Sequence, residues 1–461
     1  MKLRLLLTPL LLLPTACMLG PDFQVPANNG GESWKEGQAL DPSRLPDQWW
    51  RLFQDPKLNQ LVDRSLAANN DLAAAKSRVD TARALVGVDQ ARLFPTLDAS
   101  AGAGVARQSG NVNTMPGAEL ESRTYRGSFD LAFDPDLWGR NKRLLESSTA
   151  QAAAAEARYD SLRLGLATEV VRQYFILRGL DEQDGVLNDT LRSRQEALDI
   201  QKTKTDAGLT DGLATSSART ELELTRNDLA QVERTRGSAE HALAVLCAAR
   251  PSDFDVAASL GQRALPDIRP GLPAAVLLRR PDVRAAEHQL RSDNALIGVA
   301  QAAFYPNFNI IAGAGLESLT ASKFLEWESR VLSLGAGAAM PLVNHGANQA
   351  RLAAAKSSYE ESLANYRQTL LVALREVEDA LVDLRGLAKS RSALEAAITS
   401  AKDTLQLTRE RYNEGLTSYL DVVNADRTVL QIRLSIAVVD AQQHISLAAL
   451  AKALGGGWSG K

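Results

Sequence analysis

Histidine and cysteine are the side chains of this sequence best suited to metal binding and nucleophilic chemistry, and both are rare. The chain has four histidines and two cysteines, and no two histidines lie three or four residues apart. A zinc site needs three or four converging ligands, and the six-residue step from His241 to Cys247 is not a ligand spacing. We therefore expect no metal site, a packed thiol at Cys247, and structural or surface roles for the histidines, which are His241, His288, His345 and His444.

Motifs for catalysis and cofactor binding are missing from the sequence. The glycine pairs at 102/104, 313/315 and 335/337 lack the third glycine of a dinucleotide-binding loop, and no G-x-S-x-G nucleophile elbow occurs. The net charge of -3 is too close to neutral to indicate a nucleic-acid partner. We predict that the protein is not an enzyme and binds neither a cofactor nor nucleic acid.

Cys17 is the one residue whose surroundings predict a covalent modification. Two basic residues and an apolar stretch at residues 5–13 begin the chain, and small residues precede the cysteine. This order is typical of an export signal, and the cysteine stands where a bacterial lipoprotein is cleaved and acylated, although Pro14 occupies a place where leucine is usual. We expect residues 1–16 to be removed and Cys17 to carry a covalent N-terminal lipid. The alternative is ordinary cleavage after Ala16, which leaves a free thiol.

The composition favours long helices. The chain is rich in Ala, Leu, Arg, Glu and Gln, and only 5% of its residues are aromatic. Two cysteines exclude a disulfide framework. After the signal no run of about 18 apolar residues occurs, so we predict no transmembrane helix.

The chain contains an internal tandem duplication. Phe94-Pro95 and Tyr305-Pro306 each lead to an Ala-Gly-Ala-Gly run, and their offset is 306 − 95 = 211. Further on, Gly208 matches Gly415, an offset of 415 − 208 = 207. Four residues are therefore lost from the second copy between 316 and 345, where we expect a loop or a loop-flanked strand. The predicted segments are a signal at 1–16, a lipid-anchored leader at 17–57, repeat 1 at 58–265, repeat 2 at 266–454 and a C-terminal tail at 455–461.

Each repeat is expected to contain a helix, two strands and a long antiparallel helical hairpin. Proline is absent from residues 136–250 and after residue 341, and apolar residues recur there at steps of three, four and seven. This pattern predicts uninterrupted helices with one packed seam. The first helix of each hairpin runs for about 65 residues, or about 100 Å. The hairpins turn at Gly208 and Gly415 and return through residues 213–249 and 419–454.

Four segments between the helices alternate in polarity. In the clearest of them, Tyr125, Phe129 and Leu131 face one side, whereas Arg126, Ser128 and Asp130 face the other. Segments of about ten residues cross a bilayer when tilted, and an apolar face opposite a small or charged face is typical of a membrane β-barrel wall. A soluble sandwich is the alternative, but side chains so rich in Ala and Gly would fill its core poorly. The predicted strands are residues 96–105, 125–134, 307–316 and 332–342.

The strand count predicts the oligomeric state. Four strands cannot close a barrel, and an open sheet edge is not tolerated in lipid. Three copies of the chain supply twelve strands. We therefore expect a homotrimer that contacts outer-membrane lipid.

A duplicated strand-and-hairpin unit behind an export signal resembles the TolC family, most closely its OprM/NodT-type efflux lipoproteins of RND systems. The resemblance covers essentially the whole chain, and its most specific stretch is LLRRPDVRAAE at residues 277–287. The other stretches that carry it are residues 17–23, Trp49-Trp50 with residues 55–58, residues 136–140, residues 412–425 and residues 455–458.

The resemblance implies a fold, a place and a role. The fold is a trimeric twelve-stranded outer-membrane β-barrel, continued by a long α-helical coiled-coil tunnel in the periplasm. The role is the passive exit duct of a tripartite efflux pump that conducts drugs or other small toxic compounds. Its implied partners are a periplasmic membrane-fusion adaptor and an inner-membrane RND-type transporter.

The resemblance also implies a gate at the hairpin tips. Asp421 matches a carboxylate of the family's periplasmic constriction, and Asn424 stands where the family often has a second acidic residue. Tyr412 matches a residue that holds neighbouring hairpins together by hydrogen bonding. The first-copy equivalents are Ala214 and Thr205, which lie 207 residues earlier. The alternative is a solvated carboxylate and a packed tyrosine.

Three other functions were weighed. A periplasmic adaptor-type or structural coiled-coil lipoprotein would show one hairpin, and the duplication argues against it. A lipoprotein hydrolase would need a nucleophile arrangement, and none is visible. A metal-ion or protein-secretion duct belongs to the same family, but the mature chain would hold only Met18, Met115 and Met340, too few to relay soft metal ions.

Overall fold

The computed structural model describes residues 18–26, 33–36, 45–111, 120–261, 264–268 and 279–457. The predicted signal at 1–16 and Cys17 lie outside the described residues. The described residues form two compact units. The sheet unit comprises residues 18–26, Arg78–Ala155 and Ala286–Tyr366, and the hairpin unit comprises the remaining described residues. Both units take residues from both predicted repeats, so this division does not follow the duplication.

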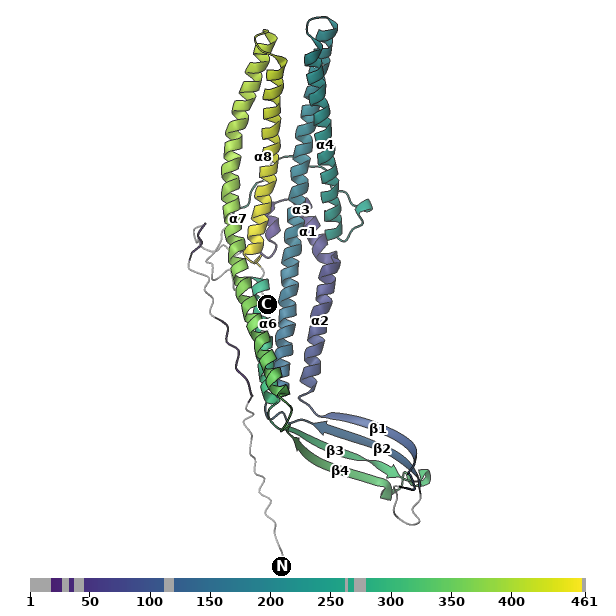
Figure 1. Cartoon of the computed structure of the whole chain (residues 1–461). Coiled ribbons are helices and arrows are strands. Elements are labelled where there is room, and N and C mark those ends of the chain that lie inside the picture. The colour runs from purple at the N-terminus through teal and green to yellow at the C-terminus, as the bar shows by residue number, and fades with distance from the viewer. Residues whose placement is uncertain are drawn as a thin grey trace, which may run out of the picture. The chain divides into compact units, whose positions relative to one another are not determined.

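The sheet unit contains one antiparallel sheet of four strands in the order β1-β2-β3-β4 (Figure 1). The four predicted strands are confirmed, with some ends displaced. The second strand begins four residues earlier than predicted because Glu121 still pairs with Arg107, and the fourth ends at Ala339 because its partner Asn307 begins the third. The strands are β1 (Thr96–Arg107), β2 (Glu121–Phe133), β3 (Asn307–Ser318) and β4 (Arg330–Ala339).

The strand register locates the four residues lost from the second copy. Thr96 pairs with Ala132 in the first copy, and Asn307 pairs with Ala339 in the second. The offsets are 307 − 96 = 211 and 339 − 132 = 207, so the loss falls between β3 and β4. Two short 3-10 turns, η3 (Ala321–Lys323) and η4 (Trp327–Ser329), occupy that connection. The predicted loop is confirmed, and the deletion leaves the strand pairing unchanged.

The two faces of the sheet differ as predicted. Side chains of directly paired residues share a face, and Phe129 pairs with Ala314, which pairs with Leu332. Phe129 is 60% exposed and Leu332 is 84% exposed, so the described residues leave this apolar face uncovered. On the other face Ser128 Oγ donates to Asp130 Oδ2 over 2.7 Å. The sheet therefore presents one apolar and one polar surface.

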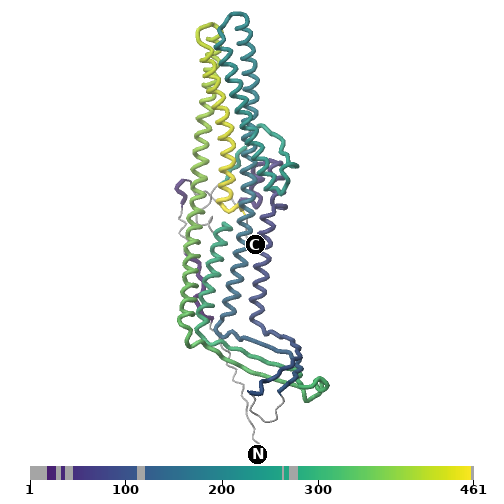
Figure 2. The backbone as a smooth tube through the Cα atoms, turned by 45° about the vertical axis from the view of Figure 1, so that its right-hand side comes forward, coloured from purple at the N-terminus to yellow at the C-terminus, as the bar shows by residue number. Residues whose placement is uncertain are grey.

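Two long hairpins dominate the hairpin unit, and they lie side by side with their turns at the same end (Figures 1 and 2). Their first helices have 67 residues each, or about 100 Å, in agreement with the predicted length. The hairpins are α3 (Arg140–Asp206) with α4 (Gly212–Leu246) and α7 (Ala347–Asn413) with α8 (Tyr419–Ala453). The shorter α-helices within the described residues are α1 (Pro56–Ala68), α2 (Asn70–Ala91) and α6 (Pro281–Ala302).

Helix α8 differs from the expectation that no helix could span a membrane. By length and composition it is a candidate span, but 44% of its most apolar window is buried in the structure. Leu447, Leu450 and Ala451 of this helix belong to the core of the hairpin unit. Its apolar character is therefore used for packing.

The core of the hairpin unit gathers aromatic residues from the leader. Trp49, Trp50 and Phe53 form the 3-10 helix η1 (Trp49–Phe53) and are buried. Phe53 packs on Phe175 of α3 with ring centroids 5.0 Å apart. The hydroxyl of Tyr174 donates to the Asp55 carboxylate over 2.5 Å. The end of the predicted leader, from Trp49 to Asp55, is therefore part of this core.

Candidate functional site

The hairpin tips are built by the same turn in both copies. Gly208 and Gly415 have φ of +68° and +74°, a left-handed conformation that glycine adopts without strain. At the first tip Leu209 N donates to Lys204 O over 2.9 Å, and at the second Leu416 N donates to Arg411 O over 2.8 Å. Such bonds close a Schellman motif, which satisfies the last carbonyls of the incoming helix. The structure thus places both predicted glycines at the turns.

Tyr412 lies beside the second turn and joins the two hairpins. Its hydroxyl donates to Gln201 Oε1 of α3 over 3.0 Å. Lys204 Nζ lies 4.9 Å from the centre of the Tyr412 ring, within the range of a cation–π contact. The ring of Tyr419 packs on the ring of Tyr412, with centroids 5.6 Å apart. The predicted role of Tyr412 in holding hairpins together has a physical basis within one chain.

Asp421 is exposed and stabilises the start of α8. Ser418 is the N-cap of this helix, and the two side chains form a capping box, in which each bonds the other's backbone. Asp421 Oδ2 accepts hydrogen bonds from Thr417 Oγ1 over 2.5 Å and from Ser418 Oγ over 2.7 Å. These bonds hold the pKa of the Asp421 carboxyl below its ordinary value. The carboxyl is therefore charged near neutral pH.

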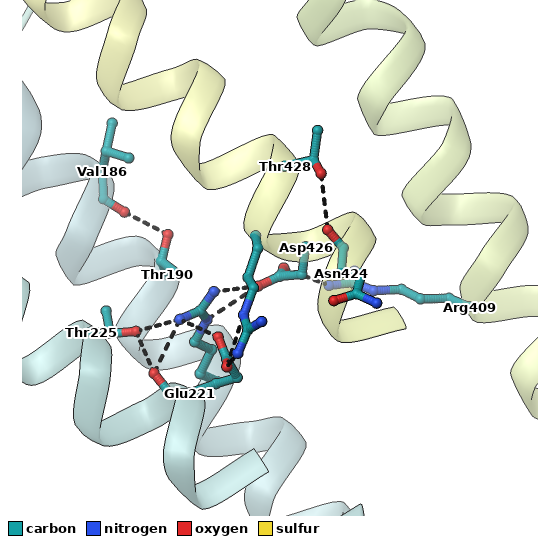
Figure 3. Close-up of polar contacts among 10 residues, drawn as sticks. Val186, Thr190, Glu221, Thr225, Arg409, Asn424, Asp426 and Thr428 are labelled. Carbon is teal, nitrogen blue, oxygen red and sulfur yellow. Dashed lines mark hydrogen bonds and ion pairs between the residues drawn. The ribbon is translucent and has the colours of Figure 1, made fainter. Parts of the chain in front are cut away.

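Asn424 is exposed one turn after Asp421, and its carbonyl accepts a hydrogen bond from Thr428 Oγ1 over 2.9 Å (Figure 3). An amide there adds no charge to the tip. The described contacts do not bring Asn424 into contact with Asp421 or Tyr412. The structure thus groups Tyr412 with α3 and leaves Asp421 and Asn424 on the exposed start of α8.

A network of ion pairs that the sequence did not predict lies just behind the tips (Figure 3). Arg194 of α3 is its centre, with a side chain only 8% exposed. Its guanidinium lies 3.2 Å from the Glu221 carboxylate of α4 and 3.0 Å from the Asp426 carboxylate of α8. It also donates to Thr225 Oγ1 over 2.8 Å. One buried arginine therefore ties three helices of the two hairpins together.

Two further arginines complete the network. Arg427 of α8 donates through Nε to Glu221 Oε1 over 2.9 Å. Arg409 of α7 lies 3.5 Å from Asp426. The Arg409–Asp426 pair is more exposed than the Arg427–Glu221 pair, so solvent screens it more strongly. All four hairpin helices thus contribute a charged side chain to this network.

A cavity of about 290 Å³ opens between the hairpins at the same level. Its lining residues include Arg194, Gln201, Tyr412, Tyr419, Val422 and Asp426. The charged network thus lies beside a space that side chains do not fill. The cavity and the network together mark the tip region as the candidate site.

The duplication contains a signal that could have revealed this network. Arg194 corresponds to Ala401 in the second copy (194 + 207), and Asp426 corresponds to Arg219 in the first (426 − 207). The second copy has an uncharged residue in place of Arg194, and the first copy has a residue of opposite charge in place of Asp426, which indicates a contact that the duplicated fold does not need. Elsewhere, among the residues that the structure describes, no group of three His, Cys, Asp or Glu side chains is arranged to hold a metal ion.

Comparisons with known proteins agree with this architecture. A family model described as outer membrane efflux protein matches residues 61–249 and 272–456. The solvent efflux pump outer membrane protein SrpC of Pseudomonas putida is 31% identical, with 97% of each chain covered. Outer membrane protein OprJ of Pseudomonas aeruginosa is 30% identical, with 96% of this chain and 93% of the relative covered. The cation efflux system protein CusC of Escherichia coli is 30% identical, with 96% of each chain covered.

Solved structures have the same fold. The outer-membrane channel OprN is similar with a TM-score of 0.89 and 30% identity, over 95% of this chain and 99% of the channel. The CmeC outer membrane channel of Campylobacter jejuni is similar with a TM-score of 0.91 and 26% identity, over 96% of this chain and 95% of the channel.

Proposed function

This chain belongs to the family of outer membrane efflux proteins, and on that premise we propose that three copies assemble into one channel with a gate at the hairpin tips. The protein is an outer-membrane component of an efflux system and acts as its exit duct. The family is one of channels. The proposal concerns how this chain builds and closes such a duct.

The observation that carries the proposal is the pair of free edges on the four-stranded sheet. Within the described residues β1 pairs only with β2, and β4 pairs only with β3. Unpaired backbone groups in lipid each cost several kcal/mol, so both edges need partners. Three copies joined edge to edge give a closed barrel of twelve strands, with the apolar face toward lipid and the polar face toward water. The helices of the three hairpin units would then form the periplasmic tunnel.

The trimer is tested by light scattering of the purified protein in detergent. We expect a mass of three chains after the detergent contribution is subtracted. A stable monomer that still conducts ions in planar bilayers would contradict the proposed assembly.

The gate is proposed at the six hairpin turns that a trimer brings together. In each protomer the Arg194 network and the Tyr412–Gln201 hydrogen bond hold the two hairpins together. Opening must separate these charges and expose Arg194. We propose that the channel is closed while these contacts are intact. A ring of three Asp421 carboxylates adds a charge barrier at the constriction.

The partners and cargo follow from the family role. We propose a periplasmic membrane-fusion adaptor and an inner-membrane RND-type transporter as partners, because a passive duct does not supply energy. Relatives are named for solvent, toluene and cation efflux. With so few methionines, we propose small organic toxic compounds as the cargo. We further propose that Cys17 carries the N-terminal lipid and that the chain is organised as the leader and two repeats given above.

A further inference from the structure

The first described residues of the chain are held in a site that the sheet unit builds around Arg143. This arginine, near the start of α3, is buried, with 1% of its surface exposed. Its Nε donates to Leu19 O over 2.9 Å, and its Nη2 donates to Gly20 O over 3.1 Å. Nη2 also lies 3.0 Å from the Asp22 carboxylate. The buried guanidinium of Arg143 thus directs most of its N–H groups to the leader residues Leu19, Gly20 and Asp22.

Other residues of the sheet unit bind the same segment. Leu19 N donates to Trp138 O over 3.2 Å. Asn294 of α6 donates from its side-chain amide to Pro21 O over 2.8 Å. Residues 19–21 are therefore bound through backbone atoms from two helices that are far apart in sequence. Binding of backbone carbonyls fixes the path of a segment whatever its side chains are.

Glycines let the leader approach these helices closely. A Cβ added to Gly298 of α6 would lie 2.6 Å from Leu19 O and 2.9 Å from Arg143 Cγ. A Cβ added to Gly139 would lie 2.8 Å from Met18 Cγ, and this residue also has a φ of +71°. Real Cβ atoms do not make such contacts, so the docked segment or its neighbours would have to shift if either glycine carried a side chain.

The duplication provides an internal comparison. Arg143 corresponds to Ala350 in the second copy (143 + 207), and Gly298 corresponds to Gly87 in the first (298 − 211). No atom lies within 4 Å of a Cβ added to Gly87. The equivalent site thus lacks the arginine and, among the described residues, has nothing bound against its glycine. The chain has one leader, and it has one complete site.

We propose that this site fixes the start of the mature chain and thereby the position of the lipid anchor. The inference rests on the proposed acylation of Cys17, which is bonded to Met18, so that their Cα atoms are about 3.8 Å apart across a trans peptide. An acyl chain on a fixed residue enters the membrane at one place relative to the strands of the same unit. On a free leader it could enter anywhere within the leader's reach. Arg143 is accordingly a positioning residue for the anchor.

Two pairs of variants test the site. Gly298→Ala introduces a methyl group where the leader lies, and Gly87→Ala is its matched control at the equivalent position of the first copy, where no described part of the leader lies. Both changes replace glycine by alanine inside a helix, so both raise helix propensity. Arg143→Ala removes the buried guanidinium, and Arg140→Ala removes an exposed arginine of the same helix. Should Arg143→Ala fail to fold, the glycine pair decides the question.

The readout is the rate at which chymotrypsin cuts the full-length protein within residues 18–23, measured by mass spectrometry of the released peptide. Cleavage follows the population of the undocked leader. We expect Gly298→Ala and Arg143→Ala to be cut at least about tenfold faster than wild type, and both controls to be cut at the wild-type rate. Equal rates in all four variants, with trimer and conductance intact, would overturn the docking site.

The mass of the same peptide tests the anchor. We expect the mass of residues 17–23 with an added lipid. An unmodified Cys17 would overturn the anchoring part of the inference and leave the conductance of the trimer unaffected. If the wild-type trimer did not conduct ions in planar bilayers, that result would instead contradict the proposed duct. The two failures are therefore distinguishable.

Discussion

Two aspartates near the second hairpin turn differ in what their carboxylates contact. Asp421 is exposed and bonded to Thr417 and Ser418 of its own turn, whereas Asp426 is paired with Arg194 of the other hairpin. The first can act on a permeating ion, and the second can act on the position of a helix. The proposed charge barrier and the proposed mechanical closure thus depend on different residues, and each has its own variant.

Arg194→Ala tests mechanical closure. It leaves Glu221 and Asp426 without their shared buried partner, and breaking a buried ion pair costs about 3–5 kcal/mol, with the remaining Arg427 contact favouring the low end. We expect the hairpins to separate more readily and single-channel conductance in planar bilayers to rise. Arg192→Ala, on the same helix, removes a surface pair worth at most about 1 kcal/mol and should change nothing. Wild-type conductance in Arg194→Ala would show that the network does not hold the gate.

Asp421→Ala tests the charge barrier. We expect conductance to rise and block by multivalent cations to weaken, with the trimer retained. Because Asp421 also caps α8, Ser418→Ala is the control: it removes the cap, worth about 1 kcal/mol, but keeps the charge. Equal effects of the two variants would assign the change to the cap and not to the charge.

The pH dependence of cation block follows from the same carboxylate. Within one chain, hydrogen bonds from Thr417 and Ser418 hold the pKa of Asp421 below its ordinary value, so the charge of the single carboxylate is lost only as pH falls through that lowered pKa. We expect wild-type block by multivalent cations to be unchanged between pH 7 and pH 5. Loss of block within that range would point to a different titrating group.

At the scale of elements, the hairpin turns depend on left-handed glycines. Gly415→Ala forces a Cβ into this conformation, at a cost of roughly 1–2 kcal/mol. We expect trypsin to cut faster at Arg411, beside the turn. Gly386→Ala, within α7 and with nothing within 4 Å of an added Cβ, raises helix propensity and should not speed that cleavage. Unchanged cleavage in Gly415→Ala would mean that the turn does not set the order of the tip.

The elements were predictable where their signals are local and periodic. Alternating polarity revealed the strands, and the absence of proline with a repeating apolar seam revealed the long hairpins. The capping box of Ser418 and Asp421 was not predicted, although its signal is local in the sequence. The Arg194–Asp426 pair was not predicted because its residues are 232 positions apart and each looks like an ordinary charge on a solvated helix. The Arg143 site was not predicted either, because Arg143 and Leu19 are 124 positions apart in the sequence.

At the scale of the whole molecule, the duplication predicts how neighbouring copies join. Inside the chain β2 pairs with β3, and the equivalent pairing in the second copy is β4 with β1 of the next chain. Phe129 pairs with Ala314. The second-copy equivalent of Phe129 is Ala336 (129 + 207), and the first-copy equivalent of Ala314 is Ala103 (314 − 211). Ala336 should therefore lie opposite Ala103 of the neighbouring protomer. Both residues lie on the apolar face, as Phe129 and Ala314 do, so the predicted pairing keeps that face continuous.

The most direct measurement of a closed trimeric barrel is cross-linking of the double variant Ala103→Cys with Ala336→Cys. After mild oxidation, or treatment with a short bifunctional thiol reagent, we expect denaturing gels to show covalent species of up to three chains and no more. Ala99→Cys with Ala336→Cys is the matched control on the same face, displaced along β1 by four residues or about 13 Å, and should cross-link far less. Absence of cross-links in the first pair, equal cross-linking in both pairs, or species larger than three chains would contradict the twelve-stranded barrel.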